Sequence, residues 1–177
     1  MEFPQRKRQR LRDFDYSSPG VYFITQCIKD GADILGNVCV GDGVLDVPYV
    51  ELSPIGKLIE NQIAEINRVY EHISIDKYVI MPNHIHLIVF LTAQNGTSRT
   101  PSPTNQEIPK LMSTLKRFVN RSCGRDIFQR SYHDHIIRNE AAFLKIWQYI
   151  DTNPAEWELD CFHPQNQGKE QTHDSLF

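Results

Sequence analysis

The stretch YVIMPNHIHLIVF, residues 78 to 90, decides the fold. Two apolar runs, Lys77 to Met81 and Ile85 to Leu91, flank Pro82-Asn83, a dipeptide typical of turns. The stretch therefore predicts two adjacent strands that form a hairpin.

Within this hairpin, His84 and His86 are two residues apart, so their side chains point to the same face of the strand. Ile85 and Leu87 then face the core. Two neighbouring imidazoles can hold one divalent metal ion through their ring nitrogens. The alternative is that one histidine caps the turn and the other is a hydrogen-bonded polar residue.

A second histidine pair has the same spacing. His133 and His135 lie on another predicted strand, with Asp134 between them on the opposite face. Spacing alone does not separate the two pairs, so either could bind a metal.

The rest of the chain alternates strands with helices. A β-branched and aromatic first strand follows a Pro-Gly turn, and a Gly- and Val-rich region holds one or two further strands. Helical spacing of apolar residues predicts three helices. The expected segments are strands at Val21 to Ile28, within Gly36 to Ser53 and at His133 to Arg138, and helices from Pro54 to about Tyr70, across Ile108 to Val119 and from Glu140 to Pro154. This order predicts an α+β fold with helices on one face of a largely antiparallel sheet, leaving the other face for a ligand.

The last predicted helix carries the second candidate for chemistry. Its apolar stripe includes Ile146 and Ile150 and packs on the sheet, whereas Tyr149 lies off that stripe. Lys145, Tyr149 and Asn153 follow one another at four-residue steps and share a side face. A tyrosine placed there can reach out over the sheet, or it can help to pack the stripe. Asn153 also suits a helix C-terminus.

Composition limits the class of protein. Hydrophobic residues make up 40% and charged residues 23% of the 177 residues, as in globular domains that do not enter membranes. The longest apolar run, Leu87 to Leu91, is far shorter than the roughly 20 residues that cross a bilayer. The four cysteines are widely spaced, which favours neither a zinc ribbon nor a disulfide framework. We therefore expect a cytoplasmic protein without a membrane partner.

Charge is unevenly distributed although the net charge is −3. The N-terminal segment RKRQRLR, residues 6 to 12, and the region from Lys110 to Arg138 are basic, whereas the residues after Arg138 are mostly acidic. Such polarity suits a phosphate-binding surface on an acidic body, but it also fits solvated helix faces. We divide the chain into a basic arm (1–15), a domain (16–160) with a polar linker (92–105), and a polar tail (161–177).

Three motifs taken together resemble the HUH single-strand transposases, most closely the REP-associated tyrosine transposases, a bacterial branch of the single-tyrosine insertion-sequence family. The motifs are VIMPNHIHLIV, the stretch FQRSYHDHIIRNE at 128 to 140, and WQYIDTNP at 147 to 154. Their order and spacing agree with that family over about residues 16 to 160. The chain departs from the family at Phe128, His133 and Asp151-Thr152, and none of these differences removes a catalytic group.

The resemblance implies a ferredoxin-like (RRM-like) βαββαβ core with the histidines of the HUH motif on a central strand. It selects His84 and His86 as metal ligands over His133 and His135. It selects Tyr149 as nucleophile over Tyr132. Asn153 matches the position that supplies a third, oxygen ligand.

The activity implied is metal-dependent cleavage and rejoining of single-stranded DNA near hairpins, as in transposition and recombination at REP-like palindromes, through a 5′-phosphotyrosine link. Imidazole ligands alone favour zinc or a later transition metal, whereas the resemblance and an oxygen ligand indicate Mg²⁺ or Mn²⁺. A homodimer is compatible with the resemblance. The predicted DNA contacts are Arg6, Lys7, Arg8, Arg10, Arg12, Lys116, Arg117, Arg121, Arg125, Tyr132 and Arg138.

Two other functions fit the same residues. The first is a nucleic-acid-binding regulator that keeps the fold without catalysis; its binding would be indifferent to Tyr149 and to chelation. The second is a metal-dependent hydrolase that activates water and leaves no protein–DNA adduct.

Overall fold

A computed structural model describes residues 14–40, 47–93 and 106–166. Four antiparallel strands form the main sheet in the order β4-β5-β1-β6. The strands are β1 (Gly20–Cys27), β4 (Ile73–Ile80), β5 (His84–Leu91) and β6 (His133–Ile137). With helices α1 (Pro54–Val69) and α2 (Glu107–Cys123) they make the βαββαβ order of a ferredoxin-like fold. The α+β class and the predicted hairpin of β4 and β5 are thereby confirmed.

The larger core lies between the sheet and the pair α1 and α2. Alternate residues of β5, namely Ile85, Leu87 and Val89, face this side and are completely buried. The apolar stripes of the two helices meet them, with Ile63 and Leu115 among the buried residues. The alternation of β5 consequently turns His84 and His86 toward the other face.

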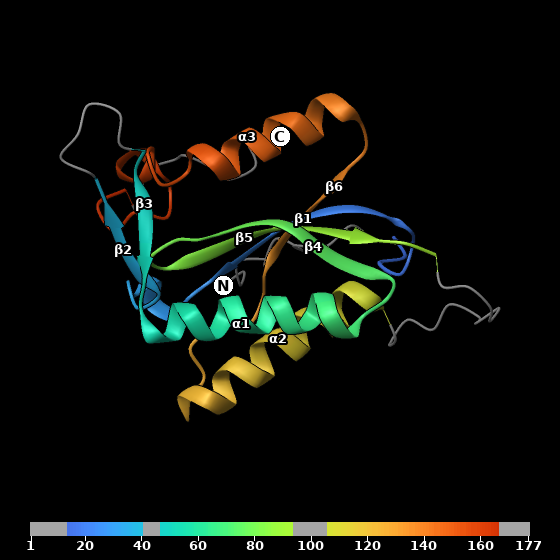
Figure 1. Cartoon of the computed structure of the whole chain (residues 1–177), viewed down its shortest axis with the longest axis horizontal. Coiled ribbons are helices and arrows are strands. Elements are labelled where there is room, and N and C mark those ends of the chain that lie inside the picture. The colour runs from blue at the N-terminus through green and yellow to red at the C-terminus, as the bar shows by residue number, and fades with distance from the viewer. Residues whose placement is uncertain (1–13, 41–46, 94–105, 167–177) are drawn as a thin grey trace, which may run out of the picture.

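The final helix, α3 (Glu140–Thr152), lies on that other face, opposite α1 and α2 (Figure 1). The sequence had suggested that all helices cover one face. The difference arises because the sheet is apolar on both sides: Phe23 and Ile88 pack against Ile146 and Ile150 of α3 in a second, smaller cluster. The helix therefore covers part of the histidine face and brings its side chains over the sheet.

Local signals explain where the helices begin and end. The Ser53 hydroxyl oxygen accepts from the backbone nitrogens of Ile55 and Gly56, and Pro54 starts α1. Asn139 caps α3 by accepting from the nitrogen of Ala142 at 2.8 Å. At the end of α2, Gly124 adopts a φ of 66°, a left-handed conformation that favours glycine.

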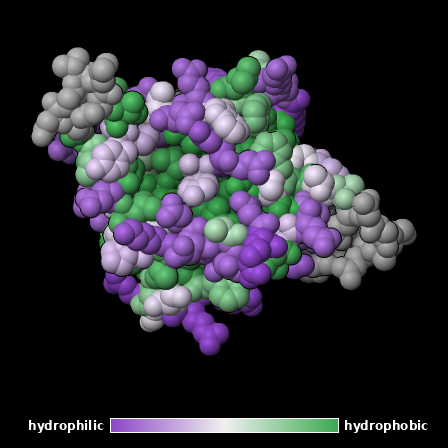
Figure 2. All heavy atoms as spheres, viewed as in Figure 1, coloured by the Kyte–Doolittle hydropathy of each residue, from purple (hydrophilic) through white to green (hydrophobic). Residues whose placement is uncertain are grey.

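A short two-stranded ribbon, β2 (Gly36–Cys39) and β3 (Tyr49–Leu52), lies at one end of the molecule beside α1 (Figure 1). In the same view, hydrophobic residues show through the middle of the molecule and hydrophilic residues occupy most of its margin (Figure 2). Among the described residues, none of the helices combines the length and the apolar character that crossing a membrane requires. Residues 1–13 of the predicted basic arm lie outside the described residues, as do residues 94–105 of the predicted linker.

Gly56 gives a test of how closely α1 approaches the loop before β2. A Cβ at this position would overlap the carbonyl oxygen of Leu35. Helix propensity alone predicts that Gly56→Ala stabilises the protein by about 1 kcal/mol. Because the overlap forces the helix away, we expect the opposite sign, a loss of about 1–3 kcal/mol in the free energy of unfolding measured in urea. Lys57→Ala, at the exposed neighbouring position, should change it by less than about 0.5 kcal/mol, and an equally small change for Gly56→Ala would contradict the close approach.

Candidate active site: a histidine pair beneath helix α3

His84 and His86 form the centre of the site at the start of β5. Both side chains are completely buried on the face that α3 partly covers. Their Nε2 atoms are 3.0 Å apart and point at one another. Two ring nitrogens cannot both present lone pairs at this distance unless a proton or a cation lies between them. Nitrogen ligands about 2.1 Å from one ion, at right angles, are also about 3 Å apart.

The other nitrogen of each ring is held by a neighbouring side chain. The Nδ1 of His86 lies 2.8 Å from the hydroxyl oxygen of Thr25, on the adjacent strand β1. The Nδ1 of His84 lies 2.9 Å from the amide oxygen of Asn83. Such contacts orient a histidine so that Nε2 is presented to a metal.

The other hydrogen bonds of Asn83 determine which atom of its side-chain amide faces His84. Its amide nitrogen donates to the carbonyl oxygens of Gly31 and Phe162, at 3.3 and 3.0 Å. The amide oxygen must therefore face His84, and the Nδ1 of His84 donates to it. This leaves Nε2 of His84 as the nitrogen with a lone pair, which is the form that binds a metal ion.

Asp160 completes a group of three potential ligands. It follows the short helix η2 (Trp157–Leu159), and its carboxylate Oδ2 is 3.9 Å from Nε2 of His84. One atom each from His84, His86 and Asp160 lie within 4.8 Å of one another, and all three residues are buried. Asp160 was not predicted as a ligand, because no motif or periodicity in the sequence distinguishes it from other acidic residues.

This donor set fits a divalent metal ion. Two imidazole nitrogens and one carboxylate oxygen suit zinc, manganese and related ions. The buried amide oxygen of Asn153, which has no hydrogen-bond partner among the described residues, adds an oxygen of the kind that Mg²⁺ and Mn²⁺ prefer. A buried carboxylate beside two neutral rings is costly unless positive charge compensates it.

Tyr149 projects from α3 onto the histidine pair. Its hydroxyl is 3.2 Å from Nε2 of His86, and its ring packs edge-on against His86 and Phe23. Burial raises the pKa of the Tyr149 phenol well above its usual value, and the negative charge of Asp160 raises it further. The phenol is therefore protonated at neutral pH and needs help to act as a nucleophile.

Asn153 lies one helical turn beyond Tyr149 and is almost fully buried, with 1% of its surface exposed. Its amide nitrogen donates to Oδ2 of Asp160 at 3.0 Å. The structure thus brings together all four residues predicted for the centre: His84, His86, Tyr149 and Asn153. Which of them act as ligand or nucleophile stays a prediction.

The competing histidine pair lies on the same face of the sheet. His133 pairs with Thr25, the β1 residue that also pairs with His86, whereas His135 pairs with Phe23, which lies opposite Ile88. They lie on the edge strand β6 and are half-buried. Burial lowers the pKa of His135, and the neighbouring Arg138 lowers it further. Among the described residues, the buried three-ligand group includes neither of them.

The predicted DNA contacts are scattered. Arg138 is exposed and directly follows β6, close enough to His135 that its charge lowers the pKa of that histidine. Lys116, Arg117 and Arg121 belong to α2 and Arg125 follows it, on the far side of the sheet from the histidines. The Lys116 ammonium donates to the carbonyl oxygens of Gln129 and Arg130. The predicted arm residues Arg6, Lys7, Arg8, Arg10 and Arg12 lie outside the described residues.

Tyr132, predicted to contact DNA through an exposed ring, is buried. Only 5% of its surface is exposed, and it packs in the larger core with α1 and α2. The cause is the alternation of the strand: His133 and His135 face α3, so Tyr132 faces the opposite way. A buried ring does not offer a surface on which a base can stack.

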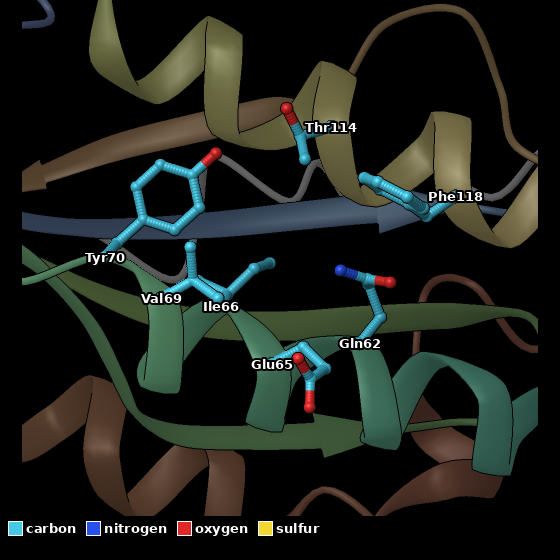
Figure 3. Close-up of a pocket in the computed structure, with 7 residues that line it drawn as sticks. All are labelled: Gln62, Glu65, Ile66, Val69, Tyr70, Thr114 and Phe118. Atoms are coloured by element: carbon cyan, nitrogen blue, oxygen red, sulfur yellow. The ribbon is translucent and has the colours of Figure 1, made fainter.

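A cavity of about 270 Å³ lies on the far side of the sheet, between α1 and α2 (Figure 3). Ile66, Val69 and Phe118 give it apolar walls, and Glu65 is its charged residue. Glu65 is paired with Arg68 at 2.6 Å, and the described lining residues include no basic group that would attract a phosphate. The histidine pair is therefore the better candidate for a catalytic centre.

The chain has a relative among known bacterial proteins. The chain is 30% identical over 171 residues to an uncharacterised protein of Haemophilus influenzae, a match that covers 88% of this chain and 91% of that one. The chain belongs to the family of this Haemophilus protein. No protein-family profile matches it.

Among solved structures, a REP-associated tyrosine transposase bound to a REP hairpin matches with a TM-score of 0.59 and 18% identity, over 84% of this chain and 73% of that one. A proposed transposase from Deinococcus radiodurans gives a TM-score of 0.45 and 15% identity, over 81% of this chain and 95% of that one. The first match confirms, at the level of the fold, the resemblance that the three motifs indicated. The protein thus has the fold of a REP-associated tyrosine transposase. Its His-His-Asp group combines two histidines of strand β5 with Asp160.

The cysteines near the site give a test of its burial. Burial raises the pKa of the Cys27 thiol to about 12, and the neighbouring Cys161 and Asp160 contribute to the shift. Since the thiolate is the reactive form, only about one molecule in 10⁴ is reactive there at pH 8. We expect iodoacetamide to label Cys39 and Cys123, which are half-exposed, well before Cys27 in the native protein. Peptide mass spectrometry measures this; equal rates for Cys27 and Cys39 would contradict the burial of this side of the site.

Proposed function

We propose that this protein is a metal-dependent nickase and strand transferase that cleaves and rejoins single-stranded DNA next to hairpins through a 5′-phosphotyrosine link on Tyr149. The observation that carries the proposal is the position of the Tyr149 hydroxyl, 3.2 Å from Nε2 of His86, at the centre of the buried histidine pair. The hydroxyl reaches the same ring nitrogen that faces His84, so it lies beside the position that an ion shared by the two histidines would occupy.

The reaction proposed for Tyr149 is an in-line attack on a phosphodiester. The Tyr149 oxygen loses its proton and forms a bond to phosphorus, the bond from phosphorus to the 3′-oxygen breaks, and that oxygen takes up a proton. Because the phosphotyrosine keeps the phosphodiester energy, a second 3′-hydroxyl can attack it and release Tyr149. One tyrosine then supports both cleavage and joining without a nucleotide cofactor.

We propose Mg²⁺ or Mn²⁺ as the ion at His84 and His86, with an oxygen from Asn153, as the resemblance implies, or from Asp160 beside it. A divalent ion here would polarise the phosphoryl group and neutralise its charge. The protein's own part is to orient the two rings through Thr25 and Asn83. Phe23 stacks against His86 with ring centroids 5.2 Å apart and excludes water from that side of the ring.

For the substrate we propose single-stranded DNA beside a hairpin, since the solved relative with the same fold was bound to a REP hairpin. Among the predicted basic contacts, Arg138 lies near His135 and its charge lowers the pKa of that histidine. The arginines of α2 would contact DNA farther from the centre, and we propose the basic arm as a further phosphate contact. We also propose that the chain is divided into the basic arm, the domain and the polar tail described above.

A denaturing gel with end-labelled DNA from a palindrome flanking the gene tests the function. We expect a Mn²⁺- or Mg²⁺-dependent adduct that a protease removes, and we expect Tyr149→Phe to reduce it by at least about 10³-fold because the nucleophile is lost. Tyr132→Phe is the matched control: it removes a hydroxyl from a buried tyrosine on the other face, and should keep the adduct.

The other outcomes separate the competing functions. Cleavage without an adduct that survives Tyr149→Phe would indicate a metal-dependent hydrolase that uses water. Hairpin binding that EDTA and Tyr149→Phe leave unchanged, with no cleavage on several palindromes, would indicate a non-catalytic nucleic-acid-binding regulator.

A further inference from the structure

The segment after α3 turns back over the histidine pair. Residues 154–166 form a series of turns, and η2 lies within them. The Phe162 ring is 4.6 Å from the His84 ring and the Trp157 ring is 6.0 Å from it. The carbonyl of Phe162 also accepts a hydrogen bond from Asn83, the residue that orients His84. The segment is thus fastened to the same residues that shape the candidate metal centre.

Asp160 is the charged residue that this segment places in the site. Only 3% of its side chain is exposed. Its Oδ1 accepts from the backbone nitrogen of Phe162 at 2.7 Å, and its Oδ2 accepts from Asn153 at 3.0 Å. The same Oδ2 faces Nε2 of His84. Both oxygens are therefore fixed, and one of them points at the histidines.

The Asn153 amide has one orientation that satisfies these contacts. A carboxylate only accepts hydrogen bonds, so the atom of Asn153 that faces Asp160 must be the amide nitrogen. This contact lies inside the protein, where a hydrogen bond to a charged group is strong. Asn153 therefore holds Asp160 through its nitrogen, while its buried oxygen has no hydrogen-bond partner among the described residues.

We propose that Asp160 supplies the third ligand of the metal centre and that Asn153 is a positioning residue, which acts on the metal through Asp160. The inference rests on the proposed metal dependence and refines it. Two neutral imidazoles and one carboxylate give the centre a net charge of +1 with a divalent ion, instead of +2 with an amide oxygen. The segment 154–166 then becomes part of the metal centre, since without it the carboxylate is absent.

A double-mutant cycle on metal affinity separates a positioning residue from a ligand. Mn²⁺ binding to the full-length protein is measured by calorimetry and by the loss of the free Mn²⁺ signal in electron paramagnetic resonance. We expect Asn153→Ala to weaken binding by about tenfold, as for residues that orient a ligand, and Asp160→Ala to weaken it more. In the Asp160→Ala background, Asn153→Ala should weaken it by less than about twofold further.

Two controls keep the result specific. Glu158→Gln removes a charge from an exposed residue of the same segment and should leave Mn²⁺ affinity unchanged. His86→Ala reports the loss expected for a ligand. Circular dichroism and thermal melting identify any variant that fails to fold, and Asp160→Asn, which keeps the shape of the side chain, replaces Asp160→Ala in that case.

Each result decides the inference. Additive losses from Asn153→Ala and Asp160→Ala would show that Asn153 binds the metal directly, and wild-type affinity in Asp160→Ala would show that Asp160 is no ligand; either overturns it. Absence of Mn²⁺ binding in the wild type overturns it as well. A non-additive cycle without DNA nicking would confirm the inferred metal centre and refute the proposed function. An additive cycle with formation of the protein–DNA adduct would support the proposed function and refute the inferred role of Asn153.

Discussion

The approach of two histidine Nε2 atoms to 3.0 Å is the interaction on which the candidate site depends. Buried nitrogens this close must have either a hydrogen-bonding proton or a metal ion between them. The surrounding residues hold the pair in that arrangement: Thr25 and Asn83 fix the far side of each ring. Tyr149 and Asp160 then approach the same point from two segments that are distant from β5 in the sequence. The sheet supplies the rigid base, and α3 with the segment after it supplies the groups that approach from above.

Much of the fold follows from local sequence patterns. Alternation in β5 and the Pro82-Asn83 turn predict the hairpin, and helical spacing predicts α1 and α2, because each of these signals lies within a few residues. Local patterns do not predict which face of the sheet α3 covers. Residues such as Phe23 and Ile88 could equally have packed against any apolar stripe, so the sequence does not say which helix covers them.

Some residues of the candidate site could likewise be predicted from the sequence, and others could not. His84 and His86 were found because two residues on one strand face must be neighbours, and Tyr149 and Asn153 were found through the resemblance. Asp160 was missed because the chain reverses after α3, and no periodicity predicts where a reversal places a side chain. Tyr132 was misplaced although the signal was available: the alternation that puts His133 on the histidine face sends its neighbour into the core.

Asn83 has a consequence for how the protein can vary. Its side chain accepts one hydrogen bond from His84 and donates two, to carbonyls from the loop before β2 and from the segment after α3. Aspartate offers only acceptors, serine has a single donor, and glutamine is one methylene longer. Few single substitutions can meet all three demands at once. Three segments of the chain therefore depend on one buried turn residue, and sequence change in any of them is constrained by the hydrogen bonds of Asn83.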